Sequence, residues 1–157
     1  MASWGEVEAD APALAARARQ LFEAHTHKTL ATLRRDGSPR ISGTEMQFAD
    51  GEVWFGSMAN AVKALDLGRD PRFAIHSGSG DPPDWAADAK LAGVVEEITD
   101  AERRVARLGE EHARQGSHLF RADITELVVT SVAGEPPDRL VIESWHPGRG
   151  VERRERR

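Results

Sequence analysis

Residues 28–40 read Lys-Thr-Leu-Ala-Thr-Leu-Arg-Arg-Asp-Gly-Ser-Pro-Arg, a strand pattern that runs directly into a turn. Residues 28–34 are compatible with a β-strand, and residues 36–39 have turn chemistry because Gly37 adopts positive φ at little cost. Residues 41–48 again have strand character. The stretch therefore predicts an antiparallel hairpin.

A second turn extends this hairpin. Residues 49–52 read Ala-Asp-Gly-Glu, and the apolar segment Val53-Trp54-Phe55-Gly56 follows them. An Asp-Gly pair between two strand-like segments is typical of a hairpin turn. The first part of the chain is therefore predicted to form a three-stranded meander.

Helices and further strands flank the meander. Asp10-Ala11-Pro12 is a helix-start signal, Asn60 is a good N-cap, and Thr99 with Glu102 forms a capping box. The patterns predict helices over residues 12–24, after Asn60 to about Gly68, and from Thr99 to about His112, and strands over residues 73–76, 90–98, 124–132 and 140–145.

About seven short strands with two or three helices favour a mainly β fold. This pattern fits a small antiparallel barrel better than a parallel α/β sheet. Leu30-Ala31, Val94-Val95 and Leu127-Val128-Val129 are apolar on both strand faces, so they are covered on both sides. A second subunit is one way to cover them, and the pattern favours a homodimer.

Composition narrows the functional classes. The 157 residues carry 21 basic and 26 acidic side chains, a net charge of 21 − 26 = −5, which argues against nucleic acid as a partner. The absence of cysteine excludes disulfides, iron–sulfur clusters and thiol catalysis. No apolar run approaches the roughly 20 residues of a membrane helix, and the start lacks signal-peptide segments, so we expect a cytoplasmic protein without membrane contact.

The chain is long enough for one domain, which we place at residues 1–150. Residues 151–157 contain four arginines and little that can be buried. We expect this charged tail to be disordered.

Lys63 is the most informative position. If Asn60 caps the helix, Lys63 lies in the first turn, where the helix dipole disfavours a cation. The free N–H groups after the small residues Gly56, Ser57 and Ala59, together with an ammonium, would form a phosphate site. The alternative is a solvated surface lysine.

Two other segments are candidate binding sites. Arg40, Ser42 and Thr44 fall on one strand face, where Gly43 allows close approach of a flat ring, although such a face can simply meet water. Trp145-His146, at the end of the last strand, can reach over a ligand or into a partner, or the tryptophan can plug a barrel end.

Several other chemistries lack support in the sequence. The six histidines form no recognisable metal-ligand set, and we expect no metal site. Gly78-Ser79-Gly80 precedes Pro82-Pro83, which cannot open the helix of a dinucleotide-binding motif, and no Gly-x-Ser-x-Gly elbow is present. No catalytic side chain can be named, so a bound cofactor is the more plausible carrier of any reaction.

The order of these motifs resembles the pyridoxamine 5′-phosphate oxidase-like, flavin-binding split-barrel superfamily. The resemblance spans roughly residues 12–147 and is strongest at Leu30-Ala31-Thr32-Leu33-Arg34-Arg35-Asp36-Gly37-Ser38-Pro39-Arg40 and from Lys63 to Arg72. It implies a dimeric antiparallel barrel of six or more strands, with two cofactor sites at the subunit interface.

The resemblance also implies roles for individual residues. Lys63 corresponds to the phosphate-binding lysine. The segment beside the phosphate and ribityl chain corresponds to Phe55, Gly56, Ser57 and Met58, the strand beside the isoalloxazine ring to Arg40, Ile41, Ser42 and Thr44, and the tail that reaches the neighbouring ring to Trp145 and His146. Ala61 and Val62 depart from the serine and basic residue that many members have before the lysine.

The leading hypothesis is a homodimeric oxidoreductase that binds flavin mononucleotide (FMN) and transfers hydride to or from an unidentified small molecule. A deazaflavin-dependent reductase of the same fold is an alternative. Further alternatives are a non-catalytic flavin- or haem-binding carrier or sensor, and a cofactor-free dimeric interaction module.

Overall fold

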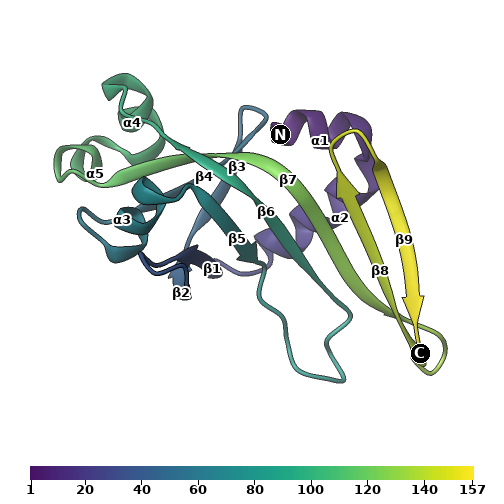
Figure 1. The fold of residues 1–157 in the computed structure, drawn as a ribbon. Helices are drawn as coiled ribbons and strands as arrows, with labels where there is room; N and C mark the ends of the chain where they lie inside the picture. Colours follow the sequence, from purple (N-terminus) through teal and green to yellow (C-terminus); the bar gives the residue numbers. More distant parts are fainter.

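The computed structural model describes residues 1–157 as one nine-stranded antiparallel sheet with five short helices (Figure 1). The strands are β1 (Lys28–Leu33), β2 (Pro39–Thr44), β3 (Met46–Ala49), β4 (Glu52–Ser57), β5 (Arg72–His76), β6 (Ala87–Glu97), β7 (His118–Ala133), β8 (Arg139–His146) and β9 (Gly150–Arg156). The helices are α1 (Trp4–Asp10), α2 (Pro12–Glu23), α3 (Val62–Arg69), α4 (Ala101–Leu108) and α5 (Glu110–Arg114). The predicted mainly β fold with flanking helices is confirmed.

The sheet is closed by a single residue. Its strand order is β2-β1-β5-β6-β7-β4-β3, so β2 and β3 lie at opposite ends of the path, yet Glu45 alone separates them in the chain. A link this short forces the sheet to curl until its two ends meet. β2 and β3 form no ladder with each other, so the barrel stays split along that line.

The predicted three-stranded meander is therefore wrong. Residues 41–48 form parts of two strands, β2 and β3, which pair with β1 and β4 respectively. The inward and outward alternation of side chains continues through Glu45: Thr44 and Met46 are covered, while Glu45 and Gln47 are exposed. The residue pattern thus contains no sign of the change of partner.

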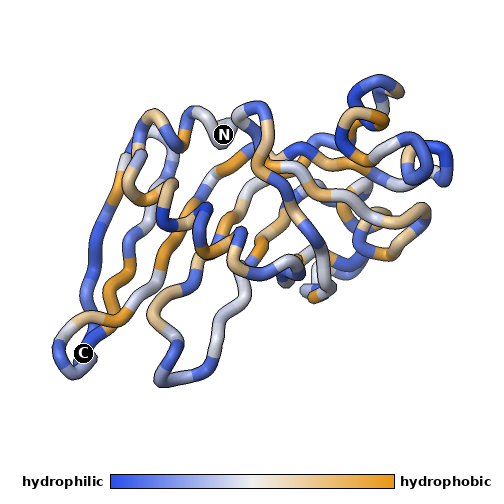
Figure 2. Tube along the Cα trace, turned by 180° about the vertical axis from the view of Figure 1, so that it is seen from behind, coloured by the Kyte–Doolittle hydropathy of each residue, from blue (hydrophilic) through white to orange (hydrophobic).

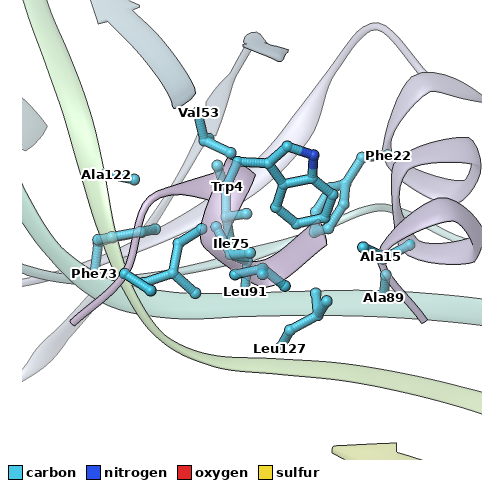
Figure 3. Packing of buried hydrophobic residues seen from close by; sticks show 14 of the residues in the cluster. Trp4, Ala15, Phe22, Val53, Phe73, Ile75, Ala89, Leu91, Ala122 and Leu127 are labelled. Carbon is cyan, nitrogen blue, oxygen red and sulfur yellow. The ribbon is translucent and has the colours of Figure 1, made fainter. Parts of the chain in front are cut away.

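The core lies between the inner face of the sheet and the first two helices. Trp4 and Val7 of α1 and Phe22 of α2 are fully buried, and α2 packs across β6 and β7. Figure 3 shows Trp4 and Phe22 above the side chains of Ile75, Leu91 and Leu127. The helix predicted at residues 12–24 is confirmed, whereas α1, which begins with a Ser3–Glu6 capping box, is an addition.

The C-terminal tail, predicted to be disordered, is a strand. β9 pairs with β8 from Leu140 opposite Arg156 to His146 opposite Gly150. β9 satisfies the backbone groups along the free edge of β8, and both of its faces stay in solvent, so its charges need no burial. Figure 2 shows this outer hairpin strand as hydrophilic beside the apolar central strands.

Two predicted helix caps are also corrected. Ala61, not Asn60, is the N-cap residue of α3, and Asn60 has a φ of 60° in the turn before the helix. Asp100, not Thr99, caps α4 by accepting a hydrogen bond from the backbone N–H of Arg103. The helix predicted to reach His112 is divided at Gly109, whose φ is 85°.

A buried carboxylate fixes α3 against the sheet. Asp66, 2% exposed, accepts hydrogen bonds from Thr32 Oγ1 at 2.8 Å, Arg40 Nε at 2.7 Å and Arg69 Nη2 at 3.0 Å. Burial alone would raise the pKa of this carboxyl, but the three hydrogen bonds together hold it below its usual value. Asp66 thus joins α3 to β1 and β2.

Gly93 is required at a bulge between β6 and β7. The register shifts between Ala92 and Gly93, and a Cβ on Gly93 would lie 1.9 Å from the carbonyl oxygen of Asp123. We expect Gly93→Ala to lower the free energy of unfolding by about 3 kcal/mol or more, measured by urea denaturation. Gly43→Ala, whose Cβ meets nothing within 4 Å, is the matched control. Equal stability of the two variants would contradict the close approach of the two strands at this bulge.

Asp66→Asn should lower the free energy of unfolding by about 2–4 kcal/mol, less than for a fully buried pair because both guanidiniums keep solvent contact. The folded-state pKa of Asp66 is lowered, so its stabilisation is present above the unfolded value of about 4 and is lost as the pH falls through the folded value. The difference from wild type should therefore shrink on acidification in denaturation curves. Asp70→Asn, which removes an exposed pair with Arg72, should matter much less.

Candidate functional site

Lys63 is a half-buried cation without an anionic partner. It is the second residue of α3, and its Nζ donates a hydrogen bond to the carbonyl oxygen of Gly43 at 2.5 Å. It forms no ion pair, and burial lowers the pKa of its ammonium group. Because a carbonyl dipole compensates a full charge poorly, this place on the edge strand β2 favours an incoming anion.

The start of α3 adds to the positive electrostatic potential around Lys63. No side chain caps the helix, so the first backbone N–H groups lack acceptors within it. The preceding turn is closed by the N–H of Ala61, which donates to the carbonyl oxygen of Met58 at 3.1 Å. Lys63 is thus in the first turn, as predicted, and its ammonium and the positive end of the helix dipole reinforce each other.

The β2 residues divide between the two faces of the sheet. Arg40, Ser42 and Thr44 point inward, whereas Ile41, 73% exposed, and Gly43 face outward. Arg40 is held by Asp66, but the hydroxyl of Ser42 is buried without any hydrogen-bond partner. The structure therefore places the carbonyl of Gly43 against Lys63 and leaves the outer face of β2 accessible at Ile41 and Gly43. On the inner face, the hydroxyl of Ser42 lacks a hydrogen-bond partner.

The segment at the end of β4 is only partly accessible. Phe55 belongs to the core, with ring centroids 5.5 Å from Phe73 and 5.7 Å from Phe120. Ser57 is half-buried, and its hydroxyl donates to the carbonyl oxygen of Met58. The residue Met58 is itself 79% exposed. Of this segment, Ser57 and Met58 lie at the surface before α3, and Gly56 sits close under Leu108.

Trp145 and His146 lie apart from Lys63 in one chain. Trp145 is 2% exposed within the core, and its indole N–H donates to Asp10 Oδ2 at 2.6 Å, which agrees with the barrel-plugging alternative. His146 points to the other face, with Nε2 2.8 Å from Glu126 Oε2 and Nδ1 buried without a partner. Four strands separate β8 from β2, so the predicted site residues form two regions.

Sequence reasoning missed two residues near Lys63. Asp66 lies one turn further along α3, between the buried Ala64 and Leu67, and a carboxylate on the apolar side of a helix is a usable signal. His118, which contacts Asn60, gave no signal because 58 positions separate them. No group of three or more histidine, aspartate or glutamate side chains is placed to hold a metal ion, and no helix is long and apolar enough to cross a membrane.

Comparisons with known proteins agree with this fold. The family model described as pyridoxamine 5′-phosphate oxidase matches residues 14–134, while no curated protein matches the sequence. A pyridoxamine 5′-phosphate oxidase-related, FMN-binding protein from Nostoc punctiforme has a TM-score of 0.61 at 16% identity, over 100% of this chain and 98% of that one.

Two mycobacterial structures are similar to the same degree. A heme-binding protein from Mycobacterium smegmatis has a TM-score of 0.60 at 16% identity, over 92% of this chain and 88% of that one. A conserved hypothetical protein from Mycobacterium tuberculosis has a TM-score of 0.59 at 23% identity, over 71% and 81%. At these identities the likeness concerns the fold, but the family model covers well over half of the sequence, and the chain therefore belongs to the pyridoxamine 5′-phosphate oxidase family.

Proposed function

We propose that the chain is an oxidoreductase that binds FMN between two copies of itself and acts on a small molecule. The observation that carries this proposal is the unpaired ammonium of Lys63 beside the uncapped start of α3. A phosphate dianion would compensate both positive charges at once. A fully solvated surface lysine, the alternative reading of the sequence, does not explain the partial burial that lowers the pKa of the ammonium group.

The surroundings of Lys63 fit the remainder of a flavin. Nothing lies within 4 Å of the place where a Cβ on Gly43 would be, so a flat ring can approach the outer face of β2 beside Ile41. Met58, which follows the end of β4 and precedes α3, is 79% exposed and is free to contact a ligand. When bound, the isoalloxazine ring would supply hydride transfer, and the protein would bind and orient it.

An uncovered apolar surface supports a dimer. Four large apolar side chains near Lys63 are more than half exposed: Ile41 at 73%, Met58 at 79%, Val62 at 52% and Leu65 at 54%. Next to them, residues paired across four strands form a row on the outer face, from Ile41 through the small side chains of Ala31 and Ala74 to Ala92. A second copy is the partner whose surface matches by symmetry.

The same arrangement accounts for His146. The row continues through Glu126 on β7, whose carboxylate contacts His146 on β8, at the far end of the same outer face. In a two-fold dimer that packs these faces together, the far end of one copy approaches the Lys63 end of the other. His146 thus fits a contact to a ring bound by the partner, whereas the buried Trp145 does not.

Ala61 and Val62 stand where many family members have a serine and a basic residue before the lysine, so the ligand should be identified directly rather than assumed to be FMN. A visible spectrum of the purified protein, followed by mass spectrometry of the released ligand, distinguishes FMN, deazaflavin and haem. Reduction by a nicotinamide donor separates an enzyme from a carrier or sensor. Failure to bind any of the three ligands would favour the interaction module. A cytoplasmic location stays a prediction of the sequence.

Lys63→Ala should weaken FMN binding by about 1–3 kcal/mol, or about 5- to 150-fold, because a charge-assisted contact to phosphate is lost. Fluorescence titration measures this, and riboflavin, which lacks the phosphate, should bind equally to wild type and variant. The apoprotein should not lose stability, since burial disfavours the charge of Lys63 and no ion pair compensates it. Arg35→Ala in the exposed β1–β2 turn is the control for charge, and unchanged FMN affinity in Lys63→Ala would refute the phosphate assignment.

Ile41→Asp should convert a dimer into monomers and abolish tight FMN binding, because a carboxylate within an apolar interface is desolvated without a partner. Sedimentation equilibrium gives the mass, with and without cofactor. Val105→Asp on α4, also an exposed apolar position, should stay dimeric. A monomeric wild type at micromolar concentration would contradict the interface.

A further inference from the structure

The turn before α3 is held by a side chain from a distant strand. In the turn from Met58 to Ala61, Asn60 has a φ of 60°, in the left-handed region that few residues other than glycine adopt and that asparagine tolerates best. Its backbone N–H donates a hydrogen bond to Nε2 of His118 at 3.3 Å. His118 begins β7 opposite Ser57, so its ring lies beside the chain that leads to Lys63.

The second ring nitrogen of His118 determines which tautomer is present. Nδ1 lies 2.5 Å from Glu97 Oε1 on β6. A backbone N–H can only donate, so Nε2 must accept, and the single proton of the neutral ring belongs on Nδ1, where it bonds the carboxylate. The ring is stacked on Phe120 with an interplanar angle of 7°.

The other charged group at this cleft is already engaged. The cleft of about 310 Å³ is lined by Glu97, Arg104 and His118, among others. Arg104 of α4 donates to the carbonyl oxygens of Ala113 and Ser117, at 3.2 and 2.8 Å. Glu97 is therefore the group that fixes the tautomer of His118.

We propose that His118 and Glu97 position the turn that begins α3, and thereby set the affinity of the Lys63 site for phosphate. This inference rests on the proposed function. Both nitrogens of His118 are engaged within the protein, so it acts through the turn rather than by touching the ligand. Without the bond, Asn60 gains freedom to leave its left-handed conformation, and the helix start and Lys63 are no longer held for an anion.

Two variants of His118 separate this role from simple packing. His118→Phe keeps a flat ring over Phe120 but removes the acceptor, and should weaken FMN binding about two- to tenfold, the range for one hydrogen bond. His118→Gln places a carboxamide oxygen near the position of Nε2 and should restore the affinity. Riboflavin binding should be the same in wild type and both variants, because the turn acts on the phosphate end.

The apoprotein provides a readout that needs no ligand. Long-range ¹H–¹⁵N NMR spectra of the His118 ring should show the proton on Nδ1, the minor tautomer of a free imidazole side chain. Glu97→Ala should shift the population toward Nε2–H and weaken FMN binding in the same direction as His118→Phe. An Nε2–H tautomer in wild type would overturn the inference.

The outcomes distinguish this inference from the proposed function. If Lys63→Ala weakens FMN binding and His118→Phe does not, the role of His118 is wrong while the phosphate site stands. If His118→Phe weakens FMN and riboflavin equally, or His118→Gln fails to rescue, the residue serves packing and the inference is wrong. A wild type that binds no FMN contradicts both.

Discussion

The architecture depends on how short the connection between β2 and β3 is. These strands occupy opposite ends of the sheet path, and Glu45 alone joins them, so the sheet has no flat arrangement open to it. Curling brings β2 close to β4, whose end leads into α3. The helix consequently lies against the edge of β2, and the closure of the barrel creates the neighbourhood of Lys63.

Two charged residues of α3 have opposite environments within one turn. Asp66 is buried and has three donors, including two guanidiniums, so the folded chain stabilises its charge. Lys63 has a single carbonyl and loses water without gaining an opposite charge. Asp66 fixes the helix against the sheet, and Lys63 keeps a poorly compensated charge that a bound anion would stabilise under the proposed function.

Local patterns predicted much of the fold. The β1–β2 hairpin follows from Asp36-Gly37 and α2 from its apolar stripe. An Asn60 cap predicts Lys63 in the first turn of α3, but that cap is one residue off, since Ala61 is the N-cap. The break between β2 and β3 at Glu45 could not be predicted, because the inward and outward alternation of side chains continues while the pairing partner changes from β1 to β4. β9 escaped prediction because its stability comes from the edge of β8 rather than from its own residues. Strict alternation along β8 would have placed Trp145 inside with Val141, and His146 outside.

The β8–β9 hairpin ends the sheet with a strand in which arginine and glutamate succeed one another. Open backbone groups along such an edge are a template on which strands from other molecules can grow. An identical strand added parallel and in register would place guanidiniums next to guanidiniums and carboxylates next to carboxylates, which is destabilising. The charges of β9 therefore disfavour parallel in-register stacking along this edge, although the main chain offers the hydrogen bonds for it.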